Sequence, residues 1–155
     1  MDSKKAVVIG NNYLSFNNEL LNIGATYSSL LVFNDDNNVI FSNSSNKDWS
    51  DEFTSSGMHK NCHLLKEAHE QMRTKDSSFT VVWDLYRPHT DKEKELDELR
   101  KYKDIVHGVG FYFRNIDGNK ILLSVAGKYS DINFGLTVLK HRSDVYKALR
   151  QVMMG

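Results

Sequence analysis

Two runs of the chain, residues 105–114 and 120–126, alternate in a way that predicts two sheet strands joined by a tight turn. The turn is marked by Asp117-Gly118, a dipeptide that favours hairpins between β-rich runs. Because successive side chains of a strand point to opposite faces, one face of this hairpin would be uniformly bulky. Its members are Val109, Phe111, Phe113, Ile121, Leu123 and Val125.

The opposite face of this hairpin carries smaller and partly polar side chains. They are Gly110, Tyr112, Leu122, Ser124 and Ala126. A sheet face of this kind can leave room for a ligand, and it can equally be the place where a helix packs closely. The pattern therefore predicts a sheet with one densely packed side, and it leaves both interpretations open for the other side.

Three more segments have strand character, and five have the apolar spacing of amphipathic helices. The strands are expected over residues 26–34, 39–42 and 79–83, with a turn at 35–38 between the first two. The helices are expected over residues 16–23, 47–55, 61–74, 90–103 and 131–154, the last with a break near 141–143. The fourth helix opens on Thr90-Asp91-Lys92-Glu93, which matches a capping box. Residues 1–14 are interpreted as a loop entering the first helix, and residues 75–78 as a turn.

The order of these elements predicts an α+β fold with a single domain over residues 1–155. Strands joined by hairpins are antiparallel, and helices fall before, between and after the hairpins. This arrangement is typical of a three-layer α-β-α sandwich around a five-stranded antiparallel sheet. PAS-like and GAF-like sensor domains also place an antiparallel sheet under helices, and they are the main alternatives for the fold.

Composition narrows the class of protein. The 20 basic residues balance the 20 acidic ones, so a dedicated nucleic-acid surface is not expected. The chain has no apolar run near the ~20 residues needed to span a bilayer, and its N-terminus does not have the pattern of a signal peptide. The single cysteine, Cys62, excludes an internal disulfide and suits a reducing cytoplasm.

Candidate catalytic chemistry is sparse. Cys62 lies near His59, His63 and His69, but on a helix these side chains point in different directions, whereas zinc needs converging ligands. The chain also lacks the GxSxG, P-loop and GxGxxG motifs. We therefore expect no metal, no cofactor and no enzymatic activity. The remaining enzyme hypothesis uses Cys62 or a histidine, against the interpretation of Cys62 as a small buried filler.

Between about Leu20 and Leu149, the sequence resembles the N-terminal signal-binding domain of LuxR-type transcriptional regulators, the acyl-homoserine-lactone receptors of bacterial quorum sensing. Trp49-Ser-Asp-Glu-Phe53 resembles the family's Trp-x-x-x-Tyr on the helix beside the pocket. Residues 79–83, which end at Trp83, resemble its Phe-x-Trp strand. Residues 105–111, with Gly108, resemble its glycine-bearing strand, and residues 121–126 resemble its last strand, where Ser124 matches a hydroxyl residue that faces the ligand.

The resemblance implies a ligand held between the sheet and the helices on one face, with Trp49 donating a hydrogen bond to a lactone carbonyl. Three positions depart from the family pattern. Cys62 stands where an aspartate binds the amide N–H of the signal, Phe53 replaces a tyrosine, and Ser45 stands where another tyrosine is common. A charged hydrogen bond is worth about 1.5–3 kcal/mol. Losing it predicts roughly tenfold to hundredfold weaker lactone binding.

We therefore expect a cytoplasmic, non-catalytic, small-molecule-sensing domain of a transcription regulator, such as a solo receptor. Its signal would be a small apolar or amphipathic molecule other than a standard acyl-homoserine lactone. The chain would carry no helix-turn-helix domain, bind neither nucleic acid nor membrane, and form a homodimer or heterodimer. The alternative is a ligand-free sensor fold that acts as a protein-interaction or dimerisation module. The expected ligand-binding residues are Trp49, Phe53, Ser45, Cys62, Trp83, Gly108 and Ser124.

Overall fold

The structure is a computed structural model that describes residues 1–75 and 78–154. Its strands form one antiparallel sheet in the order β2-β1-β5-β4-β3. The hairpin expected over residues 105–126 supplies the centre of this sheet. The strands are β1 (Tyr27–Phe33), β2 (Val39–Ser44), β3 (Phe79–Val82), β4 (His107–Arg114) and β5 (Lys120–Gly127).

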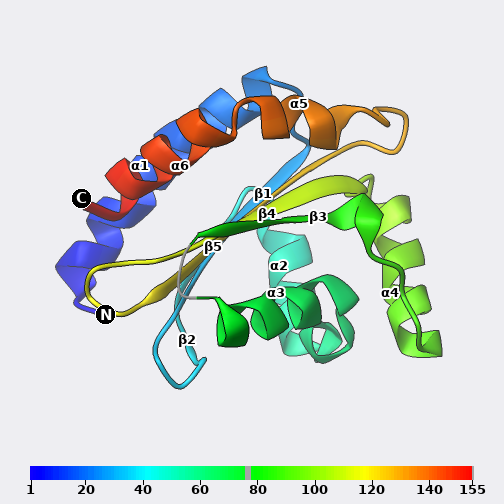
Figure 1. Ribbon diagram of the computed structural model, residues 1–155, viewed down its shortest axis with the longest axis horizontal. Helices are drawn as coiled ribbons and strands as arrows, with labels where there is room; N and C mark the ends of the chain where they lie inside the picture. Colours follow the sequence, from blue (N-terminus) through cyan, green and yellow to red (C-terminus); the bar gives the residue numbers. More distant parts are fainter. Residues whose placement is uncertain (76–77, 155) are drawn as a thin grey trace.

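Helices cover both faces of the sheet (Figure 1). One face carries α1 (Ser3–Asn22), α5 (Phe134–Lys140) and α6 (Arg142–Met154), and the other carries α2 (Lys47–Ser55), α3 (His63–Thr74) and α4 (Asp91–Tyr102). The predicted three-layer α-β-α sandwich around a five-stranded antiparallel sheet is therefore confirmed. The predicted break in the last helix is also confirmed, because α5 and α6 are separated at His141.

The sheet face under α1, α5 and α6 is the densely packed side. All six bulky residues predicted for the hairpin are buried there, in one cluster with side chains of these three helices. Phe134, Val138 and Leu149 are fully buried against them. The packing of branched and aromatic side chains on both sides of this interface makes it the main hydrophobic core of the protein.

The N-terminal segment differs from its prediction. Residues 1–14 are not a loop, because α1 already begins at Ser3, where the Asp2 side chain accepts a hydrogen bond from the Lys4 backbone N–H at 2.7 Å. Ile9 and Tyr13 are buried on the same helix face as Phe16 and Leu20. Spacings of three and four residues connect these positions, so the helical pattern extends further toward the N-terminus than predicted.

Other boundaries shift by a few residues. The helix expected from residue 61 begins at His63, after a 3₁₀ helix over Met58–Asn61. The expected turn at 75–78 includes residues 76 and 77, which lie outside the described residues. Over the ranges that the structure describes, no helix is long and apolar enough to cross a bilayer.

A buried carboxylate fixes the start of α4. The predicted capping box is present, since Thr90 accepts a hydrogen bond from the Glu93 backbone and Glu93 accepts one from Thr90. The Glu93 carboxylate also accepts hydrogen bonds from Lys66 Nζ on α3 at 2.8 Å and from the His89 backbone at 2.9 Å. The Lys66 ammonium, followed by the His89 N–H, lowers the pKa of Glu93 to about 2.

Replacing Glu93 with glutamine is expected to lower the free energy of unfolding at pH 7 by about 1–3 kcal/mol, because the charged hydrogen bonds are lost. A carboxylate with a depressed pKa stabilises the fold above its unfolded value of 4.5, and this contribution disappears as the pH falls toward about 2. Urea unfolding at pH 7 and at pH 3 measures both effects. Glu95→Gln, at an exposed position of α4, should change neither. Equal effects of the two substitutions would contradict this role of Glu93.

Candidate functional site

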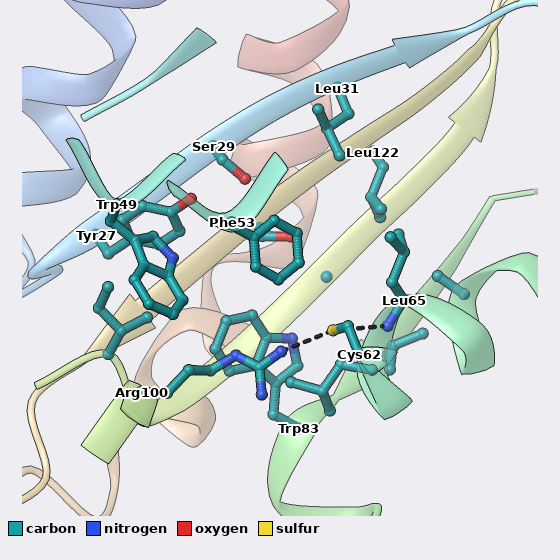
Figure 2. Close-up of a pocket in the computed structure, with 16 residues that line it drawn as sticks. Tyr27, Ser29, Leu31, Trp49, Phe53, Cys62, Leu65, Trp83, Arg100 and Leu122 are labelled. Carbon is teal, nitrogen blue, oxygen red and sulfur yellow. Dashed lines mark hydrogen bonds between the residues drawn. The ribbon is translucent and has the colours of Figure 1, made fainter. Parts of the chain in front are cut away.

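A cavity of about 70 Å³ lies between the sheet and the α2–α3–α4 layer (Figure 2). Its walls are mainly apolar, and they come from all three helices and from β1, β3, β4 and β5. The lining residues are Tyr27, Ser29, Leu31, Trp49, Phe53, Cys62, Leu64, Leu65, Ala68, Val81, Trp83, Arg100, Ile105, Gly110, Leu122 and Ser124. The sheet face that could hold either a ligand or a close-packed helix therefore does leave a hollow.

The floor of the cavity is one cross-strand row of small side chains. The strand register places Ser29 opposite Ser124, Ser124 opposite Gly110, and Gly110 opposite Val81. The next row of the same face is larger, since it contains Leu31, Leu122, Tyr112 and Phe79. Helices that rest on the larger side chains cannot reach the small row, so a space remains above it.

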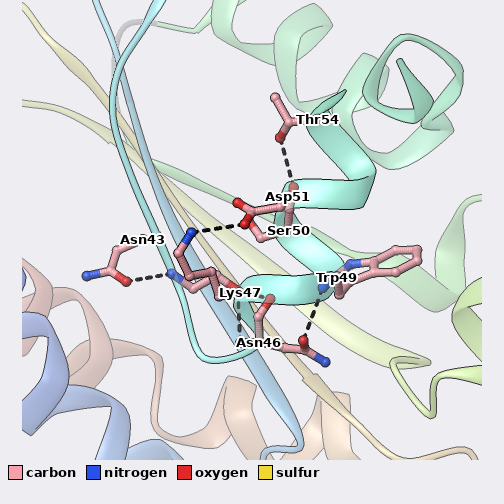
Figure 3. A network of polar contacts seen from close by, with 8 residues as sticks. Asn43, Asn46, Lys47, Trp49, Ser50, Asp51 and Thr54 are labelled. Atoms are coloured by element: carbon pink, nitrogen blue, oxygen red, sulfur yellow. Dashed lines mark hydrogen bonds and ion pairs between the residues drawn. The ribbon is translucent and has the colours of Figure 1, made fainter. Parts of the chain in front are cut away.

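Aromatic rings from α2 form one wall. Trp49 is buried, and its ring lies 5.9 Å from that of Phe53 between centroids. The start of α2 is fixed by Asn46, whose side chain accepts a hydrogen bond from the Trp49 backbone N–H at 3.1 Å (Figure 3). An ion pair between Lys47 and Asp51 spans the first turn of the helix. These contacts hold the backbone that carries Trp49 over the floor.

Trp83 lies against the backbone of Gly108 on β4. A Cβ atom added at Gly108 would lie 2.5 Å from the Trp83 ring, closer than real Cβ contacts come. Glycine at this position therefore makes room for the indole. At Gly110, two residues along the same strand, an added Cβ would meet Leu122 at 3.5 Å, an ordinary contact distance.

Gly108→Ala is expected to displace Trp83 and to lower the free energy of unfolding by about 1–3 kcal/mol, as overpacked sites do. Gly110→Ala is the matched variant on the same strand and face, and its loss should stay below about 1 kcal/mol, because the methyl group enters the cavity. Thermal unfolding and the emission wavelength of tryptophan fluorescence measure both changes. Equal stability of the two variants would show that Gly108 is not required by the indole.

The polar groups of the site lie at Cys62 and Arg100. Cys62 caps α3, where its Sγ accepts a hydrogen bond from the Leu65 backbone N–H at 3.3 Å. Arg100 Nη2 donates to the same Sγ at 2.7 Å (Figure 2). Tyr27 adds a phenol, and burial raises its pKa, so it is neutral at pH 7. Among the described residues that line the cavity, Arg100 alone is a basic side chain and none is a carboxylate.

Five of the seven residues predicted for ligand binding lie together on the cavity wall: Trp49, Phe53, Cys62, Trp83 and Ser124. Two do not line it. The Ser45 hydroxyl accepts a hydrogen bond from the Ser28 backbone N–H at 2.9 Å and so joins the loop before α2 to β1. Gly108 affects the cavity only indirectly, because its backbone lies against the ring of Trp83.

Arg100 was missed by sequence reasoning, which expected a helix over residues 90–103 but named none of its residues as ligand-binding. A signal for it exists, because Arg100 follows the buried Leu96 by four residues and therefore shares its helix face. Ser29 was also missed, since the hollow becomes visible only when the register of β1 against β5 is known.

The environments of the histidines near Cys62 suit a structural role rather than metal binding. Burial lowers the pKa of both His63 and His69, which favours their neutral forms at pH 7. His69 packs against the Phe33 ring, with the centroids 5.2 Å apart. Within residues 1–75 and 78–154, no group of three or more His, Cys, Asp or Glu side chains is placed to hold a metal ion.

No family model and no curated protein matches the sequence. Solved structures do match the fold. Escherichia coli SdiA aligns with a TM-score of 0.63 at 12% identity, over 99% of this chain and 60% of SdiA. SdiA in complex with octanoyl-rac-glycerol aligns with a TM-score of 0.61, also at 12% identity, over 99% of this chain and 58% of that one.

A third match is CepR2 from Burkholderia cenocepacia, an N-acylhomoserine-lactone-dependent transcription factor of the LuxR family. It aligns with a TM-score of 0.59 at 8% identity, over 99% of this chain and 95% of that one. The chain spans about 60% of the length of SdiA. These likenesses confirm the expected fold, that of the signal-binding domain of LuxR-type regulators.

Proposed function

We propose that this chain is a small-molecule-sensing domain that binds an amphipathic signal between its sheet and the α2–α3–α4 layer. One observation carries the proposal: a mostly apolar hollow over a row of small residues, at the place where the resemblance expects a ligand. Ligand sites in proteins have this character, with an apolar lining and a few polar groups that fix orientation. Transcription regulation, as in LuxR-type proteins, is the role that we infer for the domain.

The size of the hollow limits which ligands can bind without a rearrangement of the side chains. A volume of about 70 Å³ is enough for several water molecules, whereas pockets that bind drug-sized ligands measure about 300–1,000 Å³. A signal with an acyl chain therefore requires side chains of the wall to move. Phe53 and Leu65 are only partly buried, and they lie where α2 and α3 meet the cavity. We propose that they move apart when the ligand enters.

The lining argues against a standard acyl-homoserine lactone. Its amide N–H needs an acceptor, and the described lining residues offer no carboxylate for it. Cys62 holds the position of the family's aspartate, but its Sγ already accepts two hydrogen bonds, from Leu65 and Arg100. A thiol is also a weaker acceptor than a carboxylate. Signals without an amide donor fit this site better.

Thermal unfolding with matched eight-carbon ligands tests the proposal. At a hundredfold excess over Kd, a ligand stabilises the folded state by about 2.7 kcal/mol, which corresponds to a rise in Tm of about 5–10 °C. We expect a rise of this size with at least one ligand among octanoyl-glycerol, octanoate and octanol, and a smaller one with N-octanoyl-homoserine lactone. A Tm that none of the four raises would contradict ligand sensing. A monomer–dimer transition in sedimentation would then favour an interaction module.

A further inference from the structure

We infer that the signal carries a carboxylate and that Arg100 is the residue that binds it. The inference rests on the proposed ligand-binding function and specifies the head group of the ligand. It starts from a property of the cavity that the resemblance does not explain: the family has an acidic anchor in this site, whereas the described lining of this chain has a basic side chain and no carboxylate. Arg100 comes from α4, and Figure 2 shows its guanidinium directed at Cys62 and beside the Trp83 ring.

The Arg100 guanidinium is buried and incompletely paired. The side chain is 6% exposed. Nη2 donates to Cys62 Sγ at 2.7 Å, whereas Nη1 is a buried donor without a hydrogen-bond partner. The Asp97 carboxylate lies 3.9 Å from Nη1, beyond hydrogen-bond distance. The guanidinium is thus shielded from solvent, and its ion pair with Asp97 is too long to use the Nη1 donor, so Nη1 remains free for a second anion.

The surroundings of Arg100 favour an incoming anion. Its guanidinium carbon lies 5.9 Å from the centre of the Trp83 ring, so one side of the group rests on an aromatic surface. No acidic side chain lies on the described cavity wall to repel a negative charge. Because the wall is otherwise apolar or neutral, an anion paired with Arg100 would be desolvated on entry, and the strength of a charged hydrogen bond increases in such surroundings.

Arg100 also lines a second hollow beside the cavity. This hollow, of about 270 Å³, runs along α4 and the segment after β3, and it shares Leu64, Trp83 and Arg100 with the cavity. Lys101 and Arg87 line this outer hollow as well. Its carboxylates are Asp97 and Asp84, and Asp84 pairs with His107 Nδ1 at 2.9 Å. The head group of a ligand at Arg100 would thus lie at the junction of the two hollows.

A carboxylate fits these observations better than a phosphate. Guanidinium and carboxylate are both planar and pair through parallel hydrogen bonds, and the carboxylate is the smaller anion. The cavity beside Arg100 is small, about 70 Å³. An amphipathic ligand that combines an apolar chain with a terminal carboxylate, in the manner of a fatty acid, matches both the apolar lining and the positive charge of Arg100.

Calorimetric titration of the chain with octanoate, octanol, octanoyl-glycerol and octyl phosphate at pH 7 tests the inference. We expect octanoate to bind about tenfold to a hundredfold more tightly than octanol, the value of a charged hydrogen bond. In Arg100→Met, this preference should disappear while octanoyl-glycerol still binds. Lys94→Met is the control, because Lys94 is an exposed basic residue of the same helix that lines neither hollow, and it should keep the preference.

Cys62→Asp provides a second variant that keeps the inference testable if Arg100→Met fails to fold. Aspartate is a good N-cap for α3, and its carboxylate would stand where Cys62 now accepts from Arg100. With a resident carboxylate paired to Arg100, the preference for octanoate over octanol should be lost.

The outcomes distinguish a failure of the carboxylate–Arg100 inference from a failure of the proposed sensing function. A preference for octanoate that survives both Arg100→Met and Cys62→Asp would overturn the role of Arg100. Tighter binding of octyl phosphate, octanol or octanoyl-glycerol than of octanoate to the unchanged protein would overturn the carboxylate and leave the sensing function standing. If none of the four compounds binds, the proposed function itself fails.

Discussion

Replacing Phe134 with alanine is expected to lower the free energy of unfolding by about 3–5 kcal/mol, the range found for fully buried phenylalanines. Phe134 opens α5, is fully buried, and lies directly over Gly127 at the end of β5. A Cβ atom added at Gly127 would lie 2.5 Å from Phe134 Cγ, so ring and backbone are in close contact. Alanine would leave a cavity that neighbouring β-strand backbone cannot fill.

Urea unfolding of Phe134→Ala measures this effect, with Leu136→Ala as the control. Leu136 lies on the same short helix, but its side chain is 62% exposed, so its truncation should change the free energy of unfolding by less than about 0.5 kcal/mol. Similar losses in the two variants would mean that α5 does not pack on the sheet as described.

Replacing Ser124 with leucine is expected to weaken ligand binding strongly. Ser124 stands in the middle of the small row that forms the cavity floor, with Ser29 on one side and Gly110 on the other. A leucine side chain there would occupy much of a cavity of about 70 Å³. We expect binding of the acyl ligand to weaken about a hundredfold, a loss of about 2.7 kcal/mol. The folded state should remain, because the new apolar atoms enter space that no protein atom occupies.

Ser42→Leu is the matched control for this substitution. Ser42 lies opposite Leu31 on the edge strand β2, and it is exposed and outside the cavity. Calorimetric titration with octanoyl-glycerol or octanoate, whichever binds the unchanged protein, should give a normal Kd for Ser42→Leu and a weakened one for Ser124→Leu. If both variants bind as the unchanged protein does, the ligand lies elsewhere.

The fold could be predicted from the sequence in segments whose residue pattern is compatible with only one type of local structure. The Asp117-Gly118 turn and the alternation around it predict the central hairpin and both of its faces. The capping box at Thr90 likewise predicts the start of α4. The first turns of α1 were missed because the buried positions Ile9 and Tyr13 lie among exposed valines, which weakens the helical pattern.

The candidate site was predictable only in part, for a physical reason. Trp49, Phe53 and Trp83 could be placed because they match the Trp-x-x-x-Tyr and Phe-x-Trp motifs of the LuxR-type signal-binding domain that the sequence resembles. The hollow itself depends on which residues stand side by side across strands, and Ser29 joins Ser124 through a register that the sequence does not display. Arg100 was not singled out because most charged residues of α4 are exposed. Its spacing of four residues from Leu96 nevertheless places it on the buried face of the helix.

Entry of a ligand into this cavity can be followed by the indole N–H signals in a ¹H–¹⁵N NMR spectrum. The chain has two tryptophans, Trp49 and Trp83, and both line the cavity. Titration with octanoate or octanoyl-glycerol should move both indole signals and saturate at one ligand per chain, and Ser124→Leu should abolish the response. Indole signals that stay in place while ligand is added up to its solubility limit would show that no ligand enters this cavity.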